Sequence, residues 1–176
     1  MTFCASPFMQ MYADQKVNIP LILRSADKNN LQELMQLGDA GFSLSDASKG
    51  GLTPLHCAAR NGYKDICKHL LDNGCDPNTQ DVFGDTALHL SISYGHVECA
   101  SLIAEQQLLQ PDVCDKLGRS ALHVFAETYA SADISDSLKA LVEMLLQKGF
   151  KADVVDKMGR TAASIAKSES LLALLK

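Results

Sequence analysis

Histidine and cysteine side chains gather in one short stretch of the chain, GLTPLHCAARNGYKDICKHLLDNG at residues 51–74. His56 stands directly before Cys57, and Cys67 and His69 follow within the same stretch. Imidazole and thiolate are ligands that Zn²⁺ prefers, and a histidine near a cysteine also serves as base and nucleophile in acyl transfer. The spacing therefore indicates a metal site, a catalytic pair, or a structural unit that uses the same residue types.

Internal repeats separate these alternatives, because a structural unit returns along the chain. TPLH begins at Thr53, TALH at Thr86, SALH at Ser120 and TAAS at Thr161, at intervals of 33, 34 and 41 residues. A glycine stands two residues before each tetrapeptide, and a fainter copy of the pattern precedes them all. We therefore predict an N-terminal extension at 1–16, units at 17–50, 51–83, 84–117 and 118–158, and a truncated C-terminal cap at 159–176.

Local signals within one unit predict two helices and a turn. Thr53 is a suitable N-cap with Pro54 at the first helical position, and Gly62 ends this helix. Apolar residues then recur at helical spacing up to Gly74, namely Ile66, Cys67, Leu70 and Leu71. The following segment, CDPNTQDVFGD, is rich in turn-forming residues and predicts an extended turn or hairpin.

A helix–turn–helix–hairpin unit of about 33 residues that carries T-P-L-H-x-A resembles the ankyrin repeat. The resemblance covers residues 17–176 and implies an all-α repeat solenoid, in which stacked helix pairs carry a row of short β-hairpin or turn fingers. It also implies that the histidine that ends the first three tetrapeptides forms hydrogen bonds with the Thr or Ser three residues earlier and with nearby backbone. His56, His89 and His123 are then structural, and we predict no catalytic residue.

The cysteines fit the same interpretation. Cys57 occupies the position of Leu90 in the next unit, and Cys99 that of Ile66 in the unit before, so both are predicted to pack in the core. His96 and Cys99 form a tempting local pair for a metal, but a zinc site needs four converging ligands. No phosphate-binding glycine loop, dinucleotide fingerprint or G-x-S-x-G motif appears. We therefore predict no metal, no cofactor and no enzyme activity.

Composition narrows the class of partner. The chain of 176 residues is 47% hydrophobic and 21% charged, with a formal charge of −5. The acidic balance argues against nucleic acid, and no apolar run is long enough for membrane insertion. The N-terminus lacks the layout of a signal peptide, so we expect a cytoplasmic or nuclear protein with reduced thiols. We also expect a monomer. Residues 1–16 are either disordered or a short extra helix.

The predicted fingertips are the candidate binding surface. They read DVFGD at 81–85, DKLGR at 115–119 and DKMGR at 156–160, each with a large apolar residue before the glycine. These apolar residues either pack on neighbouring fingers or form an anchor strip for an acidic, apolar partner. Asp85 is placed to pair with Arg119, and Tyr94 is a surface or a packed turn residue. The predicted partner-binding residues are Val82, Phe83, Asp85, Tyr94, Lys116, Leu117, Arg119, Glu127, Thr128, Lys157, Met158 and Arg160.

The unit at 118–158 carries eight extra residues, in ASADISDS between its predicted helices, which are either a modifiable second contact site or a tolerated insertion. For the whole chain we expect a non-catalytic protein-interaction module, an adaptor, scaffold or stoichiometric inhibitor. An inhibitor-of-κB-like protein that sequesters a transcription factor is a narrower version. The alternative is a recognition domain of a larger enzyme or channel, although Met1 and the cap-like C-terminus favour an array that stands alone.

Overall fold

The computed structural model describes residues 15–111 and 113–175, with side chains from Leu21 onward. The prediction for residues 1–16 therefore falls almost entirely outside the described residues. Helices follow one another in pairs, and turns join them. They are α2 (Gln15–Asp27), α3 (Leu31–Asp39), α4 (Pro54–Asn61), α5 (Lys64–Asp72), α6 (Ala87–Ser93), α7 (Val97–Ala104), α8 (Ala121–Thr128), α9 (Asp136–Gln147), α10 (Ala162–Ile165) and α11 (Glu169–Leu174).

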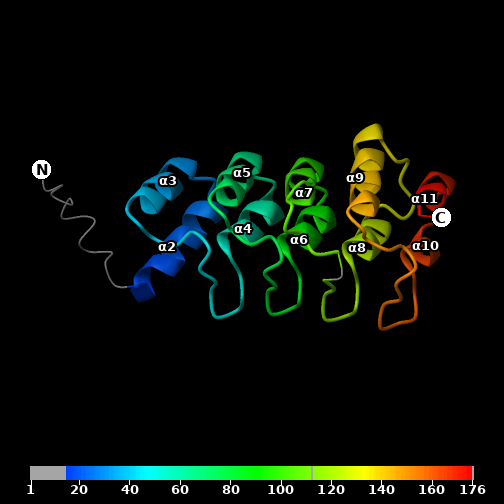
Figure 1. Cartoon of the computed structure of the whole chain (residues 1–176), viewed down its shortest axis with the longest axis horizontal. Helices are drawn as coiled ribbons and strands as arrows, with labels where there is room; N and C mark the ends of the chain where they lie inside the picture. Colours follow the sequence, from blue (N-terminus) through cyan, green and yellow to red (C-terminus); the bar gives the residue numbers. More distant parts are fainter. Residues whose placement is uncertain (1–14, 112, 176) are drawn as a thin grey trace, which may run out of the picture.

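The pairs stack side by side into an elongated solenoid (Figure 1). The first helix of each pair lies in one row with α4, α6 and α8, and the second helix lies in another row with α5, α7 and α9 (Figure 1). Loops project from the edge beside the first row and form the predicted fingers (Figure 1). Residues 15–111 and 113–175 contain no strand, so the all-α solenoid is confirmed and the fingers are turns.

Each first helix begins where the repeat pattern places its cap. Thr53 and Thr86 have extended backbone, and their hydroxyls accept the backbone N–H of His56 and His89 three residues later. This contact satisfies one of the N–H groups that the first turn of a helix leaves free. Helix α4 ends at Gly62, whose φ of 75° is left-handed, and the next helix starts two residues later.

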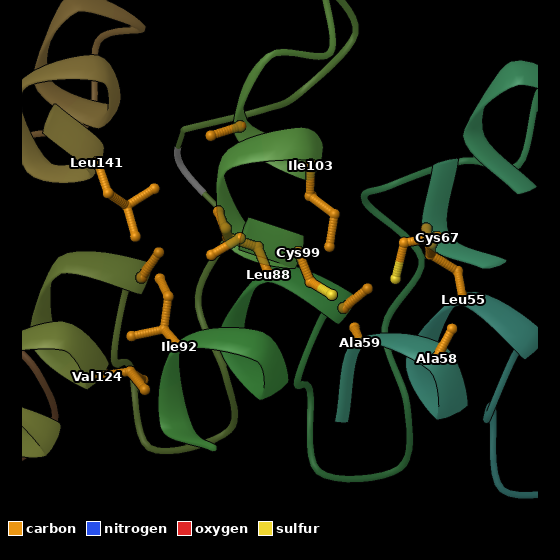
Figure 2. Close-up of a cluster of buried hydrophobic side chains, with 14 of the residues drawn as sticks. Leu55, Ala58, Ala59, Cys67, Leu88, Ile92, Cys99, Ile103, Val124 and Leu141 are labelled. Carbon is orange, nitrogen blue, oxygen red and sulfur yellow. The ribbon is translucent and has the colours of Figure 1, made fainter. Parts of the chain in front are cut away.

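Apolar residues from both rows of helices form one continuous core (Figure 2). Ala58 and Ala59 are fully buried, which lets neighbouring first helices approach closely. Cys67 and Cys99 are buried between α5 and α7 (Figure 2), as the repeat alignment predicts. Burial raises the pKa of Cys57 to about 11, so this thiol stays protonated at neutral pH. These cysteines therefore pack as small hydrophobic residues.

The fingers are joined to each other by backbone hydrogen bonds. The N–H of Val82 donates to the carbonyl of Gly50 at 2.9 Å, and the N–H of Lys116 donates to Phe83 at 2.9 Å. The N–H of Lys157 repeats the contact with Leu117 at 2.9 Å. Because these bonds run from one unit to the next, the fingers form one connected row and support each other.

The extra residues of the fourth unit form the connection between α8 and α9. The carbonyl of Ala130 accepts the backbone N–H groups of Lys167 and Ser168, at 2.9 and 3.0 Å. Ile134 is buried, and Ser135 caps α9 through the N–H of Leu138. The insertion is therefore anchored on the last unit, while the side chains around it face solvent.

Candidate functional site

The tetrapeptide histidines are held on both ring nitrogens. The Nδ1 of His56 lies 2.6 Å from the Thr53 hydroxyl and accepts the Thr53 N–H at 3.2 Å. Its Nε2 lies 3.1 Å from the carbonyl of Asp85 in the next finger. His89 and His123 make the same contacts, with Nε2 at 3.2 Å from the Arg119 carbonyl and 3.0 Å from the Arg160 carbonyl.

This geometry answers the question raised by the His–Cys stretch. A carbonyl only accepts hydrogen bonds, so Nε2 carries the proton and Nδ1 is the acceptor. Neither nitrogen of His56 then has a free lone pair for a metal ion or for a substrate proton. Burial lowers the pKa of His89 to about 4, which keeps that ring neutral. The predicted structural role of these histidines, joining helix to finger, is confirmed.

No cluster in the described part of the chain is arranged for metal binding. Among residues 15–111 and 113–175, no group of three or more His, Cys, Asp or Glu side chains converges on one point. His96, part of the tempting pair with Cys99, instead places its Nε2 3.0 Å from the carbonyl of Arg60. This contact ties the turn before α7 to the end of α4.

The apolar fingertip residues are exposed. Phe83 keeps 69% of its surface in contact with solvent, Met158 66% and Leu117 55%. Neighbouring fingers therefore leave most of each side chain uncovered, and the alternative in which these residues pack between fingers does not describe the structure. Val82 and Tyr94 are exposed as well, the latter at the C-cap of α6. An exposed apolar strip of this kind is typical of a protein-binding surface.

The fingertip arginines are engaged inside the chain. Arg119 Nε lies 2.7 Å from Asp115 and its Nη1 2.6 Å from Glu127, while Arg160 Nη2 lies 2.7 Å from Glu127. Arg160 also contacts Asp156 at 2.7 Å. Arg119 is therefore neither paired with Asp85 nor free, the two possibilities that the sequence offered, but belongs to a network around Glu127. This carboxylate holds the third and fourth fingers against α8.

Lysines are the remaining cations at the tips. Lys116 and Lys157 are exposed, and no ion pair links either of them to another described residue. Asp85 is half-buried, and burial followed by repulsion from Asp81 and Asp115 raises its pKa. Thr128 donates its hydroxyl to the carbonyl of Val124 and so is tied to its own helix. The surface that faces solvent is thus apolar and lysine-bearing.

Sequence reasoning missed one residue of this surface, Lys49. The first finger has Ser48 where the other fingers have an aspartate. The Ser48 hydroxyl accepts the backbone N–H of Leu52 at 3.2 Å. Lys49 is exposed and occupies the position of Val82, Lys116 and Lys157 in the later fingers. The sequence could have revealed this lysine, because the shift of 33 residues that identifies the leading unit aligns Lys49 with Val82.

A shallow groove lies at the opposite end of the helices from the fingers. It has a volume of about 780 Å³ and runs between α7 and α9. Lys64 and Glu98 pair across its rim at 3.3 Å, and Tyr129 and Ser135 line it. The groove combines hydroxyls with one ion pair and lacks a row of exposed large apolar side chains.

Replacing Glu127 by Gln should lower the free energy of unfolding by about 1 kcal/mol. The carboxylate serves two arginines at once, but these side chains are 24–36% exposed, so solvent screens the interaction. Glu98→Gln is the matched control, since its pair with Lys64 is 53–74% exposed and should contribute at most about 0.5 kcal/mol. Urea unfolding at low and high salt measures both. Equal losses would show that Glu127 is an ordinary surface charge.

Comparison with known proteins gives matches over much of the chain. A family model described as "Ankyrin repeats (3 copies)" matches residues 21–110 and 73–138. The bovine (Bos taurus) Ankyrin repeat domain-containing protein 37 is 39% identical over 93 residues, covering 53% of this chain and 57% of that protein. The Potassium channel AKT2/3 of Arabidopsis thaliana is 27% identical over 152 residues, 86% of this chain and 17% of the channel.

A probable serine/threonine-protein kinase of Dictyostelium discoideum is 28% identical over 134 residues, covering 74% of this chain and 15% of the kinase. The chain therefore spans less than two thirds of the length of each of these relatives. Among the described helices, none has the length and apolar character that a membrane span requires.

Proposed function

The chain belongs to the ankyrin repeat family, and from this premise we propose that it is a non-catalytic adaptor, scaffold or inhibitor that binds a partner protein along its fingertips. The observation that carries the proposal is the exposure of Phe83, Leu117 and Met158 at equivalent positions of three connected fingers. Because the fingers that carry these side chains are already bonded to each other, no backbone has to be ordered on binding. These side chains are therefore suited to act as anchors in pockets of a partner.

The neighbouring charges complete the proposed surface. Arg119 and Arg160 act through the Glu127 network by fixing the position of the third and fourth fingers. Asp85 stands beside the Thr86 cap at the finger end of α6, and Tyr94 is exposed at the other end of the same helix, so both contribute contacts only to a partner that extends from the fingertips along α6. Lys116 and Lys157 favour a partner that is acidic as well as apolar, which raises the rate of encounter. The buried thiols fit a reducing compartment, the cytoplasm or the nucleus.

Replacing the three apolar tips by serine tests the proposal. In capture from native lysate, Phe83→Ser/Leu117→Ser/Met158→Ser should retain at least about tenfold less partner than the wild type. Stability should change by less than about 0.5 kcal/mol, because the side chains are exposed. Circular dichroism checks that the variant folds.

Met35→Ser/Leu108→Ser is the matched control, since it removes exposed apolar residues away from the fingertips. Its capture should equal that of the wild type. Retention of every partner by the triple variant would remove the fingertips from the binding surface and direct attention to the groove beside α9. Equal losses in both variants would mean that capture reflects general stickiness.

The relatives favour a second candidate function, a recognition domain within a larger protein. In the potassium channel and in the kinase, the matched region is only 17% and 15% of the whole. In such a protein the fingertips would bind another part of the same assembly. The intact mass of the protein isolated from its natural source distinguishes the two: a mass close to 19.0 kDa supports the separate module.

A further inference from the structure

Two parallel rows of side chains run along the fingertips. The first position of each tip is Lys49, Val82, Lys116 and Lys157 in order along the chain, and we call this the lysine row. The second position is Gly50, Phe83, Leu117 and Met158, which we call the apolar row. The three lysines are exposed, and no ion pair joins any of them to another described residue. Cations and apolar anchors are therefore presented side by side at each of the last two fingers.

The spacing of the rows follows from how the fingers are joined. Each finger is a chain reversal with two segments, and a backbone N–H···O=C bond of 2.9 Å links each finger to the one before. Hydrogen-bonded neighbouring segments lie about 4.8 Å apart, so the rows repeat every two segments, at roughly 9–10 Å. This repeat is fixed by backbone bonds and does not depend on side-chain conformation.

One regular conformation of a partner chain matches this repeat. A polyproline II helix has three residues per turn and rises about 3.1 Å per residue, so the same face returns every ~9.3 Å. A β-strand places residues i and i+3 on opposite faces. An α-helix returns to the same face after seven residues and about 10.5 Å, so it runs progressively ahead of the fingers over four units. The backbone N–H groups of Val82, Lys116 and Lys157 already bond neighbouring fingers, which leaves side chains to make the contacts.

We propose that the fingertip rows bind an acidic segment of another protein in the polyproline II conformation, with one turn of the segment on each finger. This inference rests on the proposed function and adds the partner's conformation and charge pattern. Carboxylates face Lys49, Lys116 and Lys157, and an apolar residue faces Val82. The adjacent residue of each turn is small opposite Gly50 and large and apolar opposite Phe83, Leu117 and Met158. The third residue of each turn faces solvent.

The interruption at Val82 makes the recognition directional. The lysine row reads cation, apolar, cation, cation, so the order of acidic and apolar residues differs between the two directions of a bound segment. Arginines take no part in this pattern, because Glu127, Asp115 and Asp156 already neutralise Arg119 and Arg160. Surface lysines of this kind act on encounter rate and on specificity more than on total affinity.

Synthetic peptides test the inference directly. A labelled peptide of four triplets carries an acidic residue first, a large apolar residue second and proline third. Leucine replaces the acid in the second triplet, and alanine replaces the large apolar residue in the triplet that faces Gly50. Both sequence directions are made. Fluorescence anisotropy should show that one direction binds at least about tenfold tighter than a peptide of equal composition with a four-residue period. Binding should weaken as salt rises.

Charge exchange provides the sharper test. Lys116→Glu should weaken binding about tenfold, and a peptide with lysine in the matching triplet should restore it. Val82→Lys should reverse the preference at the second triplet from leucine to an acid. Equal binding of the three- and four-residue periods, no binding of either peptide at about 1 mM, or absence of rescue would each overturn the inference. So would capture of the wild type by phosphatidylserine vesicles in preference to the peptides.

The two proposals fail separately. If the triple serine variant loses its lysate partner while the peptides show no preference for a three-residue period, the fingertips still bind a protein, and the polyproline II ligand is wrong. If the peptides bind and the lysate partner is retained by the triple variant, the natural partner uses another surface, and both proposals are wrong for this protein.

Discussion

Gly84→Ala is expected to lower the free energy of unfolding by about 3 kcal/mol, although it adds only a single methyl group in a finger turn. Gly84 has a φ of +81°, where an L side chain costs about 1–2 kcal/mol. A Cβ placed there would lie 2.7 Å from the backbone nitrogen of Lys116 in the next finger. Backbone cannot rotate out of the way, so the bond from Lys116 to Phe83 must break or stretch.

The array supplies its own controls for this prediction. Gly159 holds the same turn position in the last finger with a φ of +74°, and nothing lies within 4 Å of its Cβ position. Gly159→Ala should therefore cost only the backbone strain of about 1 kcal/mol. Gly118 is intermediate, with the backbone nitrogen of Lys157 at 3.1 Å. The urea midpoint should be highest for the wild type and should decrease from Gly159→Ala to Gly118→Ala to Gly84→Ala. Equal losses at all three glycines would show that finger-to-finger contact contributes nothing to stability.

The regular parts of the molecule could be predicted because each depends on residues close together in sequence. A Thr N-cap, a histidine three residues later and a glycine at the helix end determine one first helix, and the pattern recurs in successive units. Core positions followed in the same way, since Cys99 and Ile66 occupy equivalent places and both are buried. A local pattern that is weak in one unit becomes reliable when it recurs at a fixed interval in several units.

The charge pairs of the proposed binding surface were harder to predict, because they depend on which side chains meet across units. Glu127 binds Arg119, eight residues earlier, and also Arg160, thirty-three residues later. Nothing in a single unit indicates this contact, and the position of Glu127 holds Arg60 in the second unit, where that arginine pairs with Asp27. Lys49 was missed for a related reason, since Ser48 replaces the aspartate that marks the other fingers.

The proposed function depends on coupling between units. A single finger exposes only one or two large apolar side chains, which is too little surface for a specific partner. The backbone bonds between fingers and the histidine contacts from each helix to the next finger fix several such side chains in one row. The histidines that resembled a reactive site therefore help to hold the proposed binding row in place.

Acidification should weaken the fold through His89, by about 3 kcal/mol between pH 6.5 and 4. Burial lowers the pKa of this ring to about 4, whereas an unfolded chain has the ordinary value near 6.5. Within this window the unfolded state takes up a proton that the native state excludes, so stability falls as pH falls. Above pH 6.5 both states are neutral and His89 contributes no pH dependence. Burial also lowers the pKa of His56, which adds a change of the same sign.

His89→Gln isolates this contribution. At pH 7 the variant should be less stable by about 2 kcal/mol, because the bonds of the ring to Thr86 and to the Arg119 carbonyl are lost. As the pH falls, the wild type loses stability that the variant keeps, and the two should become equally stable near about pH 5. Ile92→Val is the control: it removes a methyl group from the same helix, costs about 1 kcal/mol, and should cost the same at every pH. Urea unfolding from pH 7 to 4.5 measures all three proteins, and a constant difference between the wild type and His89→Gln would show that the ring takes up its proton in the folded state as readily as in water.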